Sequence, residues 1–130
     1  MGPQRTAITV EQLLEEARRG LPRLSPEDAQ EAASRGAALI DIRSEVQRLE
    51  GGGIAGATCI PRNVLEWRLD PACPHRVPDL ARRDRLVIIL CDEGCQSSLA
   101  AATLRHFGLN ATDVSGGFQT WRDAGLPVER

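Results

Sequence analysis

The stretch "LVIILCDEGCQSSLAAATLRHFG", residues 86 to 108, decides the fold of this chain. It opens with an apolar, β-branched run that ends at Cys91 and gives the strongest strand pattern in the sequence. An alanine-rich segment with helical spacing follows the serines, and Gly108 is a typical helix stop. A buried strand that runs through a short loop into a helix is typical of a parallel sheet, in which ligands bind beyond the carboxyl ends of the strands. Cys91 is expected at one of those ends.

Shorter segments repeat this alternation of strands and helices along the chain. Residues 9–20 and 25–36 each begin with a hydroxyl capping residue and end at a glycine, which predicts two helices. The run at 37–43 predicts a buried strand, and we expect Asp41 and Arg43 at its end to brace the next loop as an ion pair. The remaining predicted elements are a short strand through Leu24, a glycine-rich loop from Glu50, a brief strand at 58–60, a helical turn or two within 63–70, a last strand from Ala111 and a final helix from Phe118. This order predicts an α/β fold, with helices on both faces of a parallel sheet.

Composition narrows the classes of function. The chain has 130 residues, 42% of them hydrophobic, and a net charge of −2 without any basic block, so nucleic acid is a poor candidate partner. No apolar stretch is long enough to span a bilayer, and the charged N-terminus lacks the apolar core of a secretory signal. We therefore expect a cytoplasmic protein without a membrane partner, in which the four cysteines are reduced.

The loop after Cys91 has the features of an anion cradle. Backbone N–H groups of residues 91–96 and of the following helix N-terminus are expected to converge on the cysteine sulfur. Gly94 permits the backbone angles that turn successive N–H groups inward, and Ser97 or Ser98 can cap the helix and add a hydroxyl donor. Such a cradle lowers the pKa of a thiol and produces a nucleophilic thiolate. A buried, inert cysteine is the simpler alternative, but the loop favours a functional one.

Three motifs together resemble the single-domain rhodanese (sulfurtransferase) family. They are "CDEGCQSS" with its small-residue helix, "LIDIRSEVQRLEGGGIAGATCIPR" upstream, and "SGGFQTWRDAGLPV" downstream. The resemblance runs from about Leu24 to Val128 and includes Gly116, Gly117 and Trp121. "RNVLEWRLDP" and the C-x-E-G loop are similar to a bacterial, actinobacterial subgroup.

The resemblance implies a five-stranded, mainly parallel sheet in a rhodanese-like domain at 23–130, preceded by an N-terminal helical extension at 1–22. It implies that Cys91 accepts a sulfane sulfur as a persulfide and passes it to cyanide or a thiol, including an acceptor protein thiol. The implied partners are a small sulfur donor and a thiophilic acceptor, with no metal or organic cofactor. The residues implied to bind the substrate through loop N–H groups are Asp92, Glu93, Gly94, Cys95, Gln96 and Ser97.

The loop departs from the family pattern in its charge. Many members carry a basic residue where this chain has Gln96, and Asp92 and Glu93 directly follow the nucleophile. Because two carboxylates repel a dianion, we expect thiosulfate to be a poor donor and a less anionic sulfur species to be preferred. Arg62 is our first choice for a cation supplied from a neighbouring loop.

Of three other functions, one is disfavoured by the sequence and two stay open. A phosphatase of related fold needs a Cys-x5-Arg loop, and Ser97 stands at the arginine position, which argues against it. Cys95 could attack a modified Cys91 and form a disulfide, in a dithiol redox switch. A catalytically weak binding, regulatory or sulfur-carrier module is the third alternative.

The other cysteines and the tryptophans have structural interpretations. Cys59 lies beside Ile60 in a predicted strand and is expected in the core. Trp67 and Trp121 are expected to pack in the core or in a pocket wall. Cys73 has only a nearby histidine and no second ligand pair at recognisable spacing, so no metal site is expected.

Overall fold

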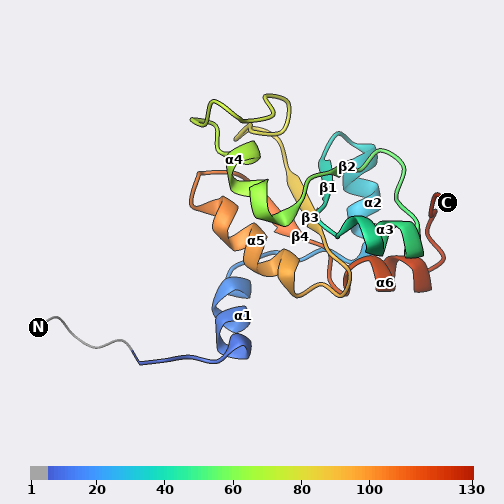
Figure 1. Cartoon of the computed structure of the whole chain (residues 1–130), viewed down its shortest axis with the longest axis horizontal. Helices are drawn as coiled ribbons and strands as arrows, with labels where there is room; N and C mark the ends of the chain where they lie inside the picture. Colours follow the sequence, from blue (N-terminus) through green and yellow to red (C-terminus); the bar gives the residue numbers. More distant parts are fainter. Residues whose placement is uncertain (1–5) are drawn as a thin grey trace, which may run out of the picture.

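A four-stranded parallel sheet forms the centre of the protein, described here for residues 6–130 of a computed structural model. The strand order is β2-β1-β3-β4, as Figure 1 shows. The strands are β1 (Ala38–Asp41), β2 (Thr58–Cys59), β3 (Val87–Leu90) and β4 (Ala111–Asp113). The register pairs Asp41 with Leu90 and Ile89 with Asp113, so β1, β3 and β4 end at the same edge of the sheet. Cys91 follows β3 directly at that edge.

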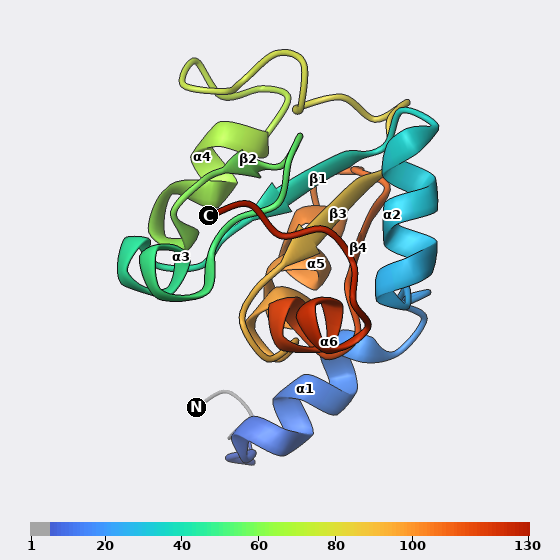
Figure 2. The ribbon, with the colours of Figure 1, turned by 90° about the vertical axis from the view of Figure 1, so that its right-hand side faces the viewer.

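Helices cover both faces of this sheet, as predicted. They are α1 (Val10–Arg18), α2 (Pro26–Ser34), α3 (Glu45–Gly51), the 3-10 turn η1 (Arg62–Val64), α4 (Leu65–Leu69), α5 (Gln96–Arg105) and α6 (Gly117–Asp123). In Figure 1, α4 and α5 lie on one side of the strands, and α2 and α6 lie on the other. Helix α1 packs on α5, and Figure 2 shows it at one end of the molecule.

Strand β3 divides its side chains between two hydrophobic cores. Val87 and Ile89 point into the core under α4 and α5, together with Cys91. Ile88 and Leu90 point into the second core, which contains Phe118 and Trp121 of α6. Successive side chains of a strand alternate between the faces of a sheet, so a run that is apolar at every position is the expected pattern for a strand covered on both sides. No helix within residues 6–130 is both long and apolar enough to cross a membrane.

The predicted fifth strand is wrong. At Leu24 there is only a single parallel bridge to Val114, outside the four strands of the sheet. The segment cannot extend because Ser25 already caps α2 and accepts a hydrogen bond from the backbone N–H of Asp28. Pro22 and Pro26 on either side also lack the N–H groups that a strand needs.

Helix α3 was not predicted, because the glycine-rich stretch from Glu50 indicated a loop. Its signal is a capping box, in which the Ser44 side chain accepts from the Gln47 backbone and the Gln47 side chain accepts from Ser44. The helix ends at Gly51, and the next residue, Gly52, has φ +89° and caps it.

The expectation for Cys59 is also wrong, and of the two places expected for Trp67 the structure shows the pocket wall and not the core. Strand β2 lies at the edge of the sheet and exposes both of its residues, and it is the following Ile60 that enters the core. Trp67 on α4 is 56% exposed and lines a surface pocket with Asn63 and His75, since the buried face of this short helix is formed by Leu65 and Leu69. Trp121 is 2% exposed and confirms its prediction.

Candidate functional site

Cys91 is buried and accepts two backbone hydrogen bonds at its sulfur. The N–H groups of Gly94 and Ser97 lie 3.1 Å and 3.3 Å from Cys91 Sγ. The Ser97 N–H belongs to the first turn of α5, where backbone N–H groups have no partner within the helix. The predicted cradle of loop and helix N–H groups is therefore present around the sulfur. Such groups stabilise an anion without carrying a full charge themselves.

Close backbone contacts with the start of α6 hold the loop in this shape. The N–H groups of Phe118 and Gln119 donate to the carbonyl oxygens of Cys91 and Asp92, at 2.8 Å and 3.1 Å. Gly117 makes this approach possible, because a Cβ there would lie 2.5 Å from the Cys91 oxygen. Gly94 itself has φ +86°, in the region that favours glycine.

Both loop serines are held by Asp113 at the end of β4, which corrects their predicted role. Helix α5 begins one residue before Ser97 and has no side-chain cap. The hydroxyls of Ser97 and Ser98 instead donate to Asp113 Oδ2 at 2.7 Å and 2.8 Å. Asp113 is fully buried, so these two charge-assisted bonds fix the first turn of α5 to the sheet.

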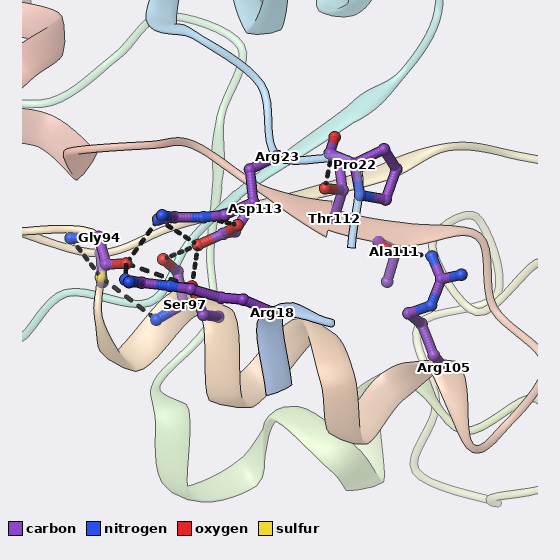
Figure 3. A network of polar contacts seen from close by, with 11 residues as sticks. Arg18, Pro22, Arg23, Gly94, Ser97, Arg105, Ala111, Thr112 and Asp113 are labelled. Atoms are coloured by element: carbon purple, nitrogen blue, oxygen red, sulfur yellow. Dashed lines mark hydrogen bonds and ion pairs between the residues drawn. The ribbon is translucent and has the colours of Figure 1, made fainter. Parts of the chain in front are cut away.

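Two arginines from the N-terminal part of the chain reach the same loop (Figure 3). Arg18 of α1 donates to the Gly94 carbonyl oxygen at 2.9 Å and to Ser98 Oγ at 3.0 Å. Arg23 donates to the same Gly94 oxygen at 2.8 Å and forms an ion pair with Asp113. The carbonyl of the loop glycine is thus held by two guanidinium groups.

A small pocket of about 220 Å³ opens at Cys91. It is lined by Gln47, Cys91, Asp92, Glu93, Cys95 and Gln96, none of them basic. Gln119 Nε2 donates to the Asp92 carboxylate at 2.7 Å, which draws this acid toward α6. Glu93 is exposed and has no such partner among the described residues. The pocket therefore carries negative charge at its rim.

A second hollow of about 230 Å³ shares Gln47 and Asp92 with the pocket of Cys91. Its other lining residues are Glu50, Gly51, Phe118, Gln119 and Arg122. Arg122 is exposed and pairs with Asp123, its neighbour in the chain. The surface beside the sulfur thus continues toward α3 and α6.

Arg43 forms the predicted ion pair with Asp41, at 2.8 Å, with both side chains buried. Arg43 also donates to the Gly52 carbonyl and stacks on the Phe118 ring, so it braces the segment after β1. Arg62, the predicted substrate cation, pairs with Glu66 at 2.6 Å and does not line the pocket of Cys91. Its proposed role toward substrate stays a prediction.

The predicted loop residues come together at one place, and sequence reasoning missed those that hold them. Asp92 to Ser97 all lie in the loop or at the first turn of α5. The missed residues are Arg18, Arg23, Gln47 and Asp113. Only Asp113 had a local signal, an acid that ends a strand as Asp41 does. Within residues 6–130, no cluster of three potential metal-binding side chains is present.

The sequence is similar to rhodanese-like proteins over most of its length. A family model described as a rhodanese-like domain matches residues 25–124. The thiosulfate sulfurtransferase GlpE of Pseudomonas entomophila is 34% identical over 104 residues, which cover 77% of this chain and 84% of that protein. GlpE of Ectopseudomonas mendocina is 35% identical over 108 residues, or 82% of this chain and 89% of that protein.

A solved structure is similar over the whole chain. A Rhodopseudomonas palustris protein of unknown function, described as a "Possible Tyrosine Phosphatase", has a TM-score of 0.87 and 31% identity, and the match covers 99% of this chain and 100% of that one. The family model covers most of the sequence, and the GlpE relatives match along most of their own length. The chain therefore belongs to the rhodanese-like domain family.

Proposed function

We propose that this protein is a sulfurtransferase in which Cys91 carries the sulfur as a persulfide. The Cys91 thiolate attacks the sulfane sulfur of a donor, the donor's bond to that sulfur breaks, and the leaving group departs with the electron pair. A thiol or cyanide then attacks the terminal sulfur, and Cys91 leaves as a thiolate. The observation that carries the proposal is the pair of N–H groups, from Gly94 and Ser97, that face Cys91 Sγ.

The loop also has donors left for the transferred sulfur. Among residues 6–130, the backbone N–H groups of Cys95 and Gln96 donate no hydrogen bond. Both residues line the pocket that opens at Cys91. A persulfide is anionic at neutral pH, so unpartnered N–H groups beside it favour the loaded state. No metal or organic cofactor enters this scheme.

The donor is proposed to be less anionic than thiosulfate. The GlpE relatives are named for thiosulfate, but here the pocket of Cys91 has two acids and no basic lining residue among residues 6–130. A dianion that enters this pocket meets the exposed carboxylate of Glu93 without a compensating cation. A persulfide or polysulfide of lower charge avoids most of this repulsion.

Steady-state sulfur transfer to cyanide tests both parts of the proposal. Cys91→Ser is expected to abolish thiocyanate formation from every donor, and Cys95→Ser is expected to retain it. Glu93→Gln should raise kcat/KM for thiosulfate by about threefold, the effect expected from one unit charge near the rim of the pocket. The kcat/KM for a neutral trisulfide donor should stay unchanged. Glu27→Gln, an exposed acid on α2, is the matched control. Wild-type kcat/KM for thiosulfate equal to that for persulfide donors would refute the donor preference.

A dithiol switch is the second candidate, because Cys91 and Cys95 line the same pocket. In this scheme the Cys95 thiolate attacks Sγ of the Cys91 persulfide, a disulfide forms, and hydrosulfide leaves with the terminal sulfur. The sulfane sulfur is the oxidant, so no other is needed. Loss of the mass of two protons from the sulfur-free protein after exposure to a donor, absent in Cys95→Ser, would favour this scheme.

Phosphate-ester hydrolysis is not supported by the residues of the loop. That chemistry needs an arginine six residues after the cysteine to clamp the oxyanion, and this position is Ser97, whose hydroxyl is bound to Asp113. A binding module without turnover would show no sulfur uptake from any donor.

A cytoplasmic location stays a prediction from the cysteine content and charge.

A further inference from the structure

The carbonyl oxygen of Gly94 accepts hydrogen bonds from two guanidinium groups (Figure 3). Arg18 Nη2 lies 2.9 Å from it and Arg23 Nη2 lies 2.8 Å from it. The second nitrogen of Arg18, Nε, donates to Ser98 Oγ at 3.0 Å. One arginine on α1 therefore ties the middle of the Cys91 loop to the first turn of α5.

The two arginines differ in their charge balance. Arg23 faces the buried carboxylate of Asp113, with Nε 2.9 Å from Oδ1, so its charge is largely neutralised. Arg18 has no carboxylate within 4 Å in the part of the chain that the structure describes. It is only partly buried, so the net positive charge beside the loop comes from Arg18.

The contact with the Gly94 carbonyl also orients the N–H on the other side of the same peptide bond. In a trans peptide the carbonyl and the following N–H point in opposite directions. The Gly94 carbonyl is held toward Arg18 and Arg23, so the N–H of Cys95 is turned to the other side of that peptide. The preceding N–H, of Gly94, is one of the two that face Cys91 Sγ. The Gly94 N–H belongs to the neighbouring Glu93–Gly94 peptide, so the two guanidinium groups hold the loop directly beside this donor.

We propose that Arg18 is a positioning residue for sulfur transfer, which holds the Gly94–Cys95 peptide and supplies from α1 the positive charge that the loop itself lacks. The inference rests on the proposed function, because it takes Cys91 as the nucleophile. It assigns a role to a helix that lies outside the family-matched segment at 25–124. The loop carries Gln96 where a cation is common in the family, and it has two acids beside the nucleophile. The positive charge of Arg18 behind the loop therefore offsets part of the negative charge around Cys91.

Charge-selective alkylation of Cys91 tests the role of Arg18 in the full-length protein. The rates with iodoacetate, an anion, and iodoacetamide, a neutral reagent, are measured at the peptide that contains Cys91. Arg18→Gln is expected to lower the alkylation rate with iodoacetate about tenfold and the rate with iodoacetamide by less. The ratio of the iodoacetate rate to the iodoacetamide rate therefore falls. Arg18→Lys keeps the charge and should keep the ratio, but its single nitrogen cannot span Gly94 and Ser98, so kcat for sulfur transfer should fall.

Arg19→Gln is the matched control, because Arg19 is the adjacent, exposed arginine and makes no side-chain hydrogen bond or ion pair within residues 6–130. Cys91 of this variant should react with both reagents at the wild-type rates. An unchanged rate ratio in Arg18→Gln, or an equal fall in Arg19→Gln, would overturn the proposal. Should Arg18→Gln fail to fold by circular dichroism, Arg18→Lys decides, and wild-type kcat in that variant would overturn the proposal.

The two proposals fail in different ways. A wild-type protein that takes up no sulfur from any donor would refute the sulfurtransferase function. The alkylation ratio would still report whether Arg18 acts on the Cys91 thiolate. Conversely, normal sulfur uptake with an unchanged alkylation ratio in Arg18→Gln would refute only the role of Arg18.

Discussion

The carboxylate of Asp113 is the point at which three distant segments of the chain meet. Its Oδ2 accepts from the hydroxyls of Ser97 and Ser98, and both of its oxygens accept from Arg23. The side chain is fully buried, so these donors replace the water that it would have in the unfolded chain. Asp113 thus joins the segment before α2 and the loop of Cys91 to the end of β4.

Replacing this carboxylate by an amide is predicted to be costly. In Asp113→Asn, an amide NH2 faces donors that need an acceptor, and Arg23 loses its counter-charge. The free energy of unfolding should fall by about 3 kcal/mol, measured by urea denaturation. Asp84→Asn removes an exposed carboxylate that pairs with Arg82 and should leave the urea midpoint unchanged. Equal midpoints for Asp113→Asn and the wild type would contradict the buried network.

At this scale the sequence predicted the position of Cys91 and its loop but not the residues that hold the loop. Cys91 and Gly94 are visible because the strand, the loop and the helix are adjacent in the chain. Serines near a helix start are commonly caps, so local reasoning assigned Ser97 and Ser98 that role. Their true partner is 16 and 15 residues away, and Arg23 is 90 residues from Asp113. Contacts of that separation depend on the register of the sheet, which no local pattern encodes.

Among the elements, the short helix α4 shows where amphipathic patterns become weak. Five residues make little more than one turn, so the buried face is set by Leu65 and Leu69 and the largest side chain, Trp67, is left outside. Helix α3 was missed for a similar reason, because a run of glycines begins only four residues after its capping box, at Gly51. Helix α5 has ten residues, enough for its apolar spacing to be recognised, and β3 is recognised by its continuous apolar run instead of by a period.

The two tryptophans give a direct measurement of this arrangement. Trp67 is 56% exposed and Trp121 is 2% exposed, with its indole N–H bonded to the Pro127 carbonyl. In Trp121→Phe, the remaining emission is expected at long wavelength and should be quenched readily by acrylamide. In Trp67→Phe, it should be blue-shifted and protected. Similar quenching of the two single-tryptophan variants would contradict the placement of α4 and α6.

Across the whole molecule, parts that are distant in sequence converge on the carboxyl edge of the sheet. The loop of Cys91 is held by α6 through Phe118 and Gln119, and by α1 through Arg18. The alternation of strands and helices was sufficient to predict the parallel sheet and the position of Cys91. It was not sufficient to place α1 against α5, because the apolar spacing of a helix does not say which neighbour it covers.

Sulfur loading of Cys91, followed by intact mass, tests the central claim most directly. The protein is incubated with a polysulfide or thiosulfate, freed of excess donor, and weighed before and after cyanide. The wild type is predicted to gain the mass of one sulfur atom and to lose it to cyanide, while Cys95→Ser gains it equally and Cys91→Ser gains none. No gain with any donor, or a cyanide-labile gain that persists in Cys91→Ser, would contradict the assignment of Cys91 as the sulfur carrier.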